Sequence, residues 1–184
     1  WIVDVNGNGD FTTIQAAIDI AQNGDEIYVM AGTYYGTGDL TEPVVDMQGK
    51  SLHLQKHPDE KGPVHVDGNN KRRCLVCDSG EGLDTVIESI TFRNGYADRG
   101  GGLYALSSSP TLKECVFTNN NSNDRGGAVY IEGGNPSLEN CVVTNNTSGY
   151  GGGFYIRQSL ASMSGGYVAG NQASGRGGGF RIID

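Results

Sequence analysis

Residues 90–104 read ITFRNGYADRGGGLY, and nearly the same phrase returns three times before residue 182. The later copies are CVFTNNNSNDRGGAVY from residue 115, CVVTNNTSGYGGGFY from residue 141 and the more divergent GYVAGNQASGRGGGFR from residue 166. Tyr104, Tyr130, Tyr155 and Arg181 lie 26, 25 and 26 residues apart along these copies. A fixed period of about 20 to 50 residues is typical of a solenoid or an array of repeated units.

The composition of each unit indicates which kind of solenoid this is. Each copy holds short runs of β-forming residues, such as TLKECVF and GLYAL, separated by Gly, Asn, Ser and Pro. No helical periodicity spans ten residues in these units, and Gly-Gly-Gly stands where a helical repeat would need helix formers. One unit is long enough for three short strands and three turns. Stacking such circuits at roughly 4.8 Å per coil predicts an all-β parallel β-helix.

Composition and charge exclude several classes of protein. The 184 residues include 30 glycines without the Gly-X-Y period of collagen, and they predict one continuous domain. Charged residues make up 18% of the chain, and the net charge is −8. This balance argues against a nucleic-acid partner, because nucleic-acid binding needs clustered Lys and Arg. No apolar run approaches membrane-spanning length, so the chain is predicted not to span a membrane.

Within the one domain we expect three segments, namely residues 1–24, 25–89 and 90–184. The first holds a short strand and the chain's only convincing helix, in which apolar residues repeat at Ile14, Ala17, Ile18 and Ala21. Thr12 and Gln15 have the spacing of a capping box, and Asn23-Gly24 is a stop signal. We expect this helix to cover the open end of the first coil. Residues 25–89 predict irregular early coils, and residues 90–184 the regular repeats.

Several runs of this chain resemble a known superfamily. GDFTTIQAAIDIAQNGDEIYVMAGTYYG (9–36), GKSLHL (49–54) and VDG (66–68) resemble the start of right-handed parallel β-helix proteins of the pectin lyase-like superfamily. SSPTLKECVFTNN (108–120) and RGGGLY (99–104) resemble secreted bacterial β-helix repeats and the GGA and FxxN repeats of polymorphic outer-membrane proteins.

The resemblance implies a right-handed β-helix of roughly seven rungs with an N-terminal capping α-helix, secreted or displayed at the cell surface. It does not imply one activity, because the superfamily includes lyases, hydrolases, esterases, epimerases and non-catalytic adhesins.

The N-terminal loop has the spacing of a calcium-binding loop. Asp4, Asn6, Asn8 and Asp10 fall at positions 1, 3, 5 and 7 of an EF-hand-type loop. Position 12, which needs a bidentate Glu, is the neutral Gln15, and no helix pattern precedes the loop. A polar turn is therefore the favoured interpretation, and a Ca²⁺ site is the alternative. No other cofactor is predicted.

Repeat positions become ladders when coils stack. We expect an inward ladder that joins Leu103, Val129, Phe154 and Phe180 to Leu112, Leu138, Phe117 and Val143. Asn94, Asn119 and Asn145 are expected at a left-handed turn, beside amides that stack along the axis at Asn120, Asn146 and Asn171. Cys115 and Cys141 are expected as buried free thiols on neighbouring rungs, and Cys74 and Cys77 as unpaired.

Two outward ladders are candidates for binding carbohydrate. Tyr104, Tyr130 and Tyr155 form an aromatic column that Arg181 continues, and a second column contains Arg99, Arg125 and Arg176, interrupted by Tyr150. Tyrosine rings suit sugar faces and arginines suit the carboxylates of an acidic polysaccharide. The alternative is that stacked aromatics only stabilise neighbouring strands.

No catalytic arrangement of the superfamily's enzymes is recognisable. His53, His57 and His65 cluster in the early coils; we expect His53 and His65 on adjacent coils, with no acid or nucleophile paired with them at repeat spacing. Two hypotheses remain. The first is a non-enzymatic scaffold, adhesin or assembly subunit, with polysaccharide as a candidate ligand. The second is a carbohydrate-active enzyme, such as a polysaccharide lyase.

The C-terminal end predicts an interface. The chain reaches FRIID directly after the last Gly triplet, without a capping pattern. Solenoids usually need a cap at both ends. Further repeats or other protein subunits are therefore expected against this end.

Overall fold

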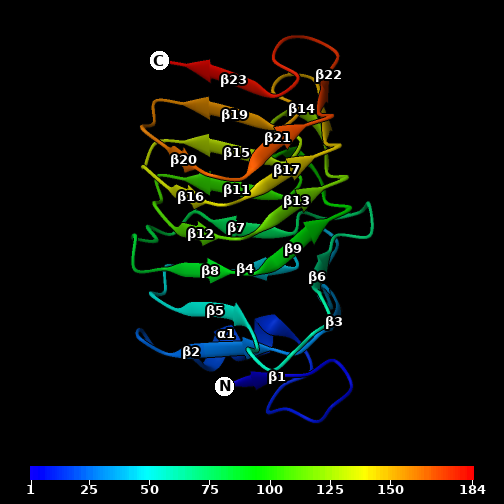
Figure 1. Ribbon diagram of the computed structural model, residues 1–184, viewed down its shortest axis with the longest axis vertical. Coiled ribbons are helices and arrows are strands. Elements are labelled where there is room, and N and C mark those ends of the chain that lie inside the picture. Colours follow the sequence, from blue (N-terminus) through cyan, green and yellow to red (C-terminus); the bar gives the residue numbers. More distant parts are fainter.

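The computed structural model describes residues 1–184 as one elongated stack of coils, with the two chain ends at opposite ends of the stack (Figure 1). Every strand pair between coils is parallel, and the longest sheet has seven strands, which corresponds to about seven coils. The first sheet contains, in spatial order, β1 (Ile2–Val3), β2 (Glu26–Val29), β5 (His53–Lys56), β8 (Val86–Glu88), β12 (Thr111–Lys113), β16 (Ser137–Glu139) and β20 (Ser162–Ser164).

Three further sheets complete the walls of the stack. The second sheet contains β3 (Gly32–Tyr35), β6 (Val64–Asp67), β9 (Ile90–Arg93), β13 (Val116–Thr118), β17 (Val142–Thr144) and β21 (Tyr167–Ala169). The third contains β10 (Tyr96–Arg99), β14 (Asn121–Arg125), β18 (Thr147–Ser148) and β22 (Gln172–Ala173). The fourth contains β4 (Val45–Asp46), β7 (Leu75–Cys77), β11 (Leu103–Leu106), β15 (Val129–Glu132), β19 (Phe154–Arg157) and β23 (Phe180–Ile183).

The third sheet corrects the expectation of three strands per coil. The two coils from β2 to β7 have three strands each, whereas each coil from β8 onward has four. The added strand follows a single left-handed residue, which is Asn94, Asn119 or Asn145 with φ of 52°, 55° and 57°. Because this residue turns the chain sharply, the few residues after it form a strand of their own before the Gly triplet. The expected turn at these asparagines is confirmed.

The register confirms the repeat period and the inward ladder. Leu112 pairs with Leu138, and Phe117 lies between Phe92 and Val143 in the second sheet. These side chains are at most 2% exposed and belong to one core cluster of 34 buried residues. The Phe92 and Phe117 rings stack with their centroids 5.1 Å apart. Of the expected inward residues, only Phe180 is open to solvent, at 44% exposed.

The four cysteines are all free, as predicted, and burial, which was expected for Cys115 and Cys141, extends to Cys74 and Cys77. Cys115 and Cys141 belong to the core cluster on successive coils, and their thiols donate to the Ile87 and Leu112 carbonyl oxygens. Burial raises the pKa of Cys115 well above its usual value. Since the thiolate is the reactive form, this cysteine behaves as a small apolar core residue.

A ladder of buried amides runs along one corner of the core, as the asparagine spacing predicted. Asn120 donates from its backbone and from Nδ2 to Asn146 Oδ1, at 2.8 and 3.0 Å. Asn146 repeats both bonds to Asn171 Oδ1, at 3.0 and 2.8 Å. Asn146 is fully buried, so its amide group cannot bond to water and needs these partners within the protein.

Glycine is required where the triplet of one coil packs against the third-sheet strand of the next coil. A Cβ on Gly152 would lie 2.2 Å from the Gln172 carbonyl oxygen, and a Cβ on Gly101 would lie 2.3 Å from that of Asn121. Both distances are far below van der Waals contact. The triplets therefore let the turns before the fourth sheet stack at strand spacing.

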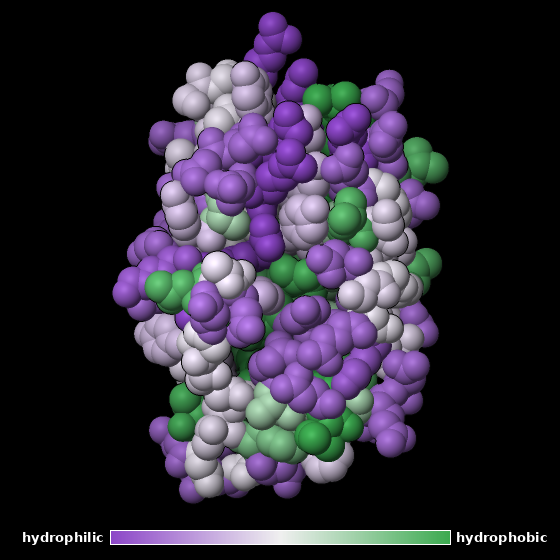
Figure 2. All heavy atoms as spheres, turned by 180° about the vertical axis from the view of Figure 1, so that it is seen from behind, coloured by the Kyte–Doolittle hydropathy of each residue, from purple (hydrophilic) through white to green (hydrophobic).

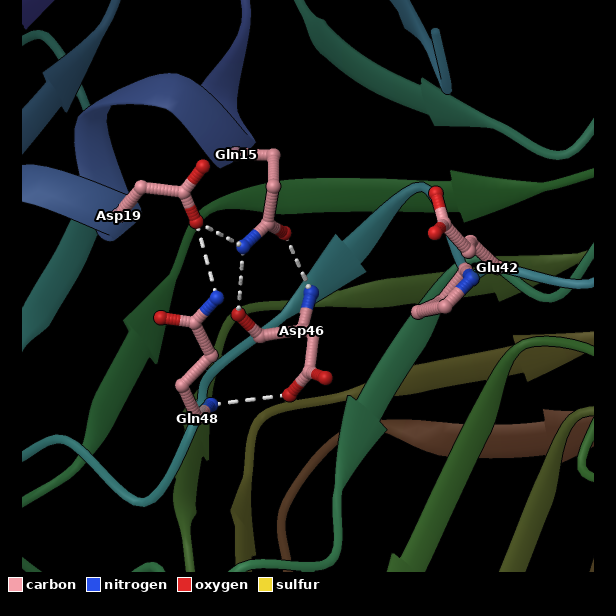
Figure 3. A pocket seen from close by; sticks show the side chains of 6 residues that line it. Gln15, Asp19, Glu42, Asp46 and Gln48 are labelled. Carbon is pink, nitrogen blue, oxygen red and sulfur yellow. Dashed lines mark hydrogen bonds between the residues drawn. The ribbon is translucent and has the colours of Figure 1, made fainter. Parts of the chain in front are cut away.

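The helix α1 (Ile14–Ile20) covers the N-terminal end of the stack and contacts β1, β2 and β4. Its N-cap is Thr13, whose Oγ1 accepts from Ala16 N at 3.3 Å, so the expected capping box at Thr12 is wrong by one residue. Gln15 is therefore not part of a capping box and contacts β4 instead. Its side-chain amide donates to Asp46 O at 3.2 Å and accepts from Asp46 N at 2.8 Å (Figure 3).

Gln15 thus pairs with the edge strand β4 as a neighbouring strand would, which explains how the helix covers the fourth sheet. At the other end of α1, Lys50 Nζ donates to Ile18 O at 2.6 Å and to Asp19 O at 3.1 Å. The helix is thereby held at both ends. With only seven residues, it cannot cross a membrane.

The C-terminal end of the stack has no such cover (Figure 1). Ile182 is 60% exposed, and a hollow of about 180 Å³ opens there between Leu138, Phe154, Met163, Phe180 and Ile182. The expectation of an exposed apolar end is confirmed.

Candidate functional site

The predicted tyrosine column exists, and its rings stack on one another. Tyr104, Tyr130 and Tyr155 occupy equivalent positions on β11, β15 and β19. Their ring centroids are 5.3 and 5.5 Å apart, with interplanar angles of 5° and 7°. The column stands outside the core cluster, on the outer face of the fourth sheet.

Arginines from the preceding coil cover this column. The Arg73 guanidinium lies 4.6 Å from the Tyr104 ring centroid, that of Arg99 lies 5.6 Å from Tyr130, and that of Arg125 lies 5.2 Å from Tyr155. Stacking and this cover leave Tyr130 fully buried and Tyr155 only 4% exposed. The expectation that Tyr130 presents its ring to solvent is therefore wrong. What the ladder presents outward is guanidinium groups.

We call the resulting line of cations the arginine ridge; it consists of Arg73, Arg99, Arg125, Arg176 and Arg181. It includes five of the chain's eight arginines. The rear face shows a line of strongly hydrophilic side chains running along the axis in its upper half (Figure 2). A molecule with net charge −8 thus concentrates positive charge on one edge.

On the last two coils, Tyr and Arg exchange their positions in the repeat. Tyr150 occupies the position of Arg125, to which it is bridged, while Arg181 pairs with Tyr155 at the tyrosine position. The exchange brings Arg125, Tyr150, Tyr155, Arg176 and Arg181 around one hollow of about 400 Å³. We call this the arginine–tyrosine hollow. Tyr150, at 43% exposed, is its accessible aromatic ring.

The charges of the hollow are only partly compensated. Asp124 lies 3.4 Å from Arg125 and 3.6 Å from Arg99, so one carboxylate serves two arginines. Arg176 and Arg181 pair with no carboxylate. Two guanidinium groups beside an exposed ring form a surface suited to an anionic, ring-containing ligand.

Of the six predicted carbohydrate-binding residues, the structure brings Arg125, Arg176 and Tyr155 together. Tyr104 and Arg99 lie on one earlier coil, outside the hollow, and Tyr130 is buried between its neighbours. The prediction did not include Tyr150 and Arg181 as binding residues. Their signal was present in the repeats as the one place where Tyr and Arg exchange positions. Only the stacked coils show that the exchange opens a hollow.

A second hollow of about 310 Å³ lies beside α1 and is acidic (Figure 3). Asp19, Glu42 and Asp46 line it, together with Gln15 and Gln48. Burial raises the pKa of Asp46 above its usual range, and nearby carboxylates add to this shift. The amide and carboxylate groups that line this hollow bond mainly to one another, and these bonds hold the helix on β4.

The histidines differ from expectation. His53 Nε2 lies 3.0 Å from Glu88 Oε2, so an acid does pair with this histidine across adjacent coils. His53 and His65 lie on β5 and β6 of one coil rather than on adjacent coils. Both His53 and Glu88 are about one-third exposed on the open face of the first sheet.

The N-terminal loop is held together by its own side chains. Asp4 Oδ1 accepts from Asn6 N at 2.8 Å and from Asn6 Nδ2 at 3.1 Å, and Asp4 Oδ2 accepts from Asn8 Nδ2 at 3.0 Å. These bonds, led by the backbone one, hold the pKa of Asp4 below its usual value. Asp10 instead accepts from Ile2 N at 2.8 Å. The contacts favour the polar-turn interpretation, and calcium binding stays a prediction.

Parallel strands stacked in four sheets around one continuous core, with amide and aromatic ladders between coils, define a parallel β-helix. Residues 64–184 match the family model described as a right-handed β-helix region, so the chain belongs to this right-handed β-helix family. No curated protein and no solved structure matches the chain.

Proposed function

We propose that the chain is a non-catalytic β-helix scaffold that binds an acidic polysaccharide at the arginine–tyrosine hollow. The supporting observation is the pair of arginines without carboxylate partners, Arg176 and Arg181, beside the exposed Tyr150. Guanidinium groups bind carboxylates through two parallel hydrogen bonds, and a tyrosine ring packs on the apolar face of a sugar.

The arginine ridge extends this surface along the axis. Arg125 and Arg99 continue from the hollow on successive coils, one strand spacing apart. A linear polymer of uronic acid lying along the ridge would meet guanidinium groups on the coils of Arg99, Arg125 and Arg176, and the Tyr150 ring on the coil between Arg125 and Arg176. Since these contacts are exposed and ionic, the affinity should fall as the salt concentration rises.

The proposal includes a secreted or cell-surface location, where acidic polysaccharides are encountered. We also propose that the chain belongs to the pectin lyase-like superfamily, because its N-terminal runs resemble sequences of that superfamily. The alternative is an enzyme of the polysaccharide lyase kind acting on the same class of polymer. A lyase would release unsaturated products, whereas a scaffold would bind the polymer and leave it intact.

Affinity electrophoresis in gels containing polygalacturonate tests this function. The wild-type protein should be retarded at low salt, and a gel with a neutral glucan should have no effect. Arg176→Ala with Arg181→Ala should remove most of the retardation. The control is Arg157→Ala, since Arg157 lies outside the hollow and pairs with Glu132 at 3.1 Å.

Equal retardation of the wild-type and double-variant proteins would refute the hollow as the binding site. Ultraviolet-absorbing unsaturated product in the same incubation, with calcium present, would replace the scaffold by the lyase alternative.

We also propose that the open C-terminal end is covered by further repeats or by another protein subunit, and a second copy of this chain offers a matching apolar end. Its edge strands β20 to β23 have unpaired backbone groups on one side, and the apolar hollow between Leu138, Phe180 and Ile182 reaches the surface. The N-terminal end of another copy is closed by α1, which leaves the C-terminal ends as the complementary apolar surfaces.

A further inference from the structure

The residues just before the glycine runs form one column across the coils that have a third-sheet strand. Arg99 pairs with Arg125, and Arg125 is bridged to Tyr150. The backbone hydrogen bond that joins Tyr150 to the coil before it recurs between Arg176 and the coil of Tyr150. The column therefore reads Arg, Arg, Tyr, Arg, with one strand spacing of about 4.8 Å between successive members.

Within the arginine–tyrosine hollow, the cations and the aromatic rings lie on different coils. The middle coil contributes Tyr150 and Tyr155 to the hollow, and no charged side chain. Arg125 comes from the coil before, and Arg176 and Arg181 come from the coil after. Arg125 and Arg176 are thus two strand spacings apart, which is about 10 Å. The hollow presents a cation, an aromatic ring and then cations along the axis of the stack.

Tyr150 is placed so that its ring can meet a ligand. It is 43% exposed, whereas Tyr155 is only 4% exposed beneath Arg125. The Tyr150 ring lies against Gly175 of the next coil, where a Cβ would be 2.6 Å from Tyr150 Cε1 and 2.9 Å from Cδ1. A side chain at this position would displace the ring. The glycine therefore lets the ring rest on the backbone next to Arg176.

The cations on the two sides of this ring are not equally compensated. Asp124 lies 3.4 Å from Arg125 but is shared with a second arginine, so it neutralises Arg125 only in part. Arg176 and Arg181 have no carboxylate partner. Anionic groups can thus bind on either side of Tyr150. A carboxylate placed over the ring itself would lose water and find no cation on that coil.

We infer that the hollow selects a linear polysaccharide in which anionic and neutral sugars alternate. The neutral sugar packs on Tyr150, and the carboxylates of its two neighbours bind Arg125 on one side and Arg176 with Arg181 on the other. Two linked hexoses are about as long as two strand spacings, so every second sugar meets a cation. This selectivity rests on the polysaccharide binding proposed above and narrows the class of polymer.

Ionic attraction alone predicts the opposite preference. A polymer with uronic acid at every position has about twice the charge density of an alternating one, so a purely electrostatic surface would bind it more tightly. Hyaluronan, in which glucuronic acid alternates with N-acetylglucosamine, is an alternating polymer without sulfate groups. Comparison of hyaluronan with polygalacturonate therefore separates selection by the hollow from attraction by net charge.

Affinity electrophoresis in gels of hyaluronan or polygalacturonate, with matched chain length and one fixed ionic strength, tests this selectivity. Hyaluronan should retard the wild-type protein more strongly at equal weight concentration. Tyr150→Ala should weaken hyaluronan binding about fivefold, as expected for the loss of one packed ring, and Tyr150→Phe should retain it. Tyr150→Arg, which completes the arginine column, should reverse the preference toward polygalacturonate. Tyr167→Ala, at a 59% exposed ring on β21, is the control and should leave both affinities unchanged.

Equal or stronger retardation of the wild-type protein by polygalacturonate would overturn the alternating selectivity and leave the proposed scaffold function standing. Hyaluronan binding by Tyr150→Ala at the wild-type level would do the same. Retardation by neither polymer would overturn both. Because Tyr150 is exposed, its variants should melt at the wild-type temperature, so that a change in retardation reports binding.

Discussion

Tyr130 shows how a residue outside the core can be as buried as one inside it. Its ring lies between those of Tyr104 and Tyr155 under Arg99, and it is 0% exposed, compared with 2% for Leu138 in the core. We predict that Tyr130→Ala lowers the free energy of unfolding by about 3–5 kcal/mol, comparable to about 2–5 kcal/mol for Leu138→Ala. Urea denaturation would measure both. A much smaller loss for Tyr130→Ala would mean that the column adds little stability.

The same residue predicts a dependence on alkaline pH. Burial, and then the hydrogen bond to Glu132, raises the pKa of Tyr130 from 10.0 to about 12. The folded state favours the neutral phenol, so this contribution is complete below pH 10 and is lost as the pH rises toward 12. Unfolding measured from pH 9 upward should show a smaller alkaline loss in Tyr130→Phe. Tyr96→Phe, at a 37% exposed ring, is the control and should behave as the wild-type protein does.

At the scale of the element, the amide ladder of Asn120, Asn146 and Asn171 links successive coils by side-chain hydrogen bonds in addition to strand pairing. Asn146→Ala would leave Asn120 N and Nδ2 without their acceptor and the Phe117 carbonyl without its donor. Each buried unsatisfied group costs about 1–3 kcal/mol, so we predict a loss of at least about 2 kcal/mol by thermal denaturation. Asn145→Gly, next to it at an exposed left-handed position, should be nearly neutral. Similar losses for both would contradict the ladder.

The capping helix predicts a second element-scale effect. Gln15→Ala would expose the backbone groups of Asp46 at the edge of β4, while Gln22→Ala changes a side chain that makes no hydrogen bond. We predict that Gln15→Ala lowers the free energy of unfolding by about 1–2 kcal/mol. Hydrogen exchange should be faster at Asp46 in this variant alone. Unchanged exchange at Asp46 would show that the helix is held by apolar packing only.

At the scale of the whole molecule, the two ends differ: one is covered and the other exposes apolar side chains. Leu160, which is 85% exposed, lies just before β20 on the last coil. We predict concentration-dependent dimerisation in sedimentation velocity, which Ile182→Lys with Leu160→Lys should suppress. Leu83→Lys is the control, because Leu83 is also 60% exposed but lies away from that end. A monomer at every concentration, or equal dimerisation in the end variant, would rule out packing of C-terminal ends.

The sequence by itself determined the architecture, because a solenoid repeats its constraints at every coil. The spacing of Leu112 and Leu138, the left-handed Asn119 and Asn145, and the glycine triplets each recur, and the structure confirms their places. Local patterns of this kind can be recognised because neighbouring coils impose the same requirement on equivalent residues.

Only the tertiary structure decided what faces solvent and where sites form. Periodicity showed that Tyr130 points away from the core but not that Arg99, 31 residues earlier, covers it. The fourth strand of each later coil, the pairing of Gln15 with β4 and the meeting of His53 with Glu88 depend on how coils of unequal length align. The hydrogen bond from Arg72 to the Gly38 carbonyl depends on a loop folding back over a turn from the next coil. Such contacts join residues at different positions of the repeat or in the irregular early coils, so the period alone does not predict them.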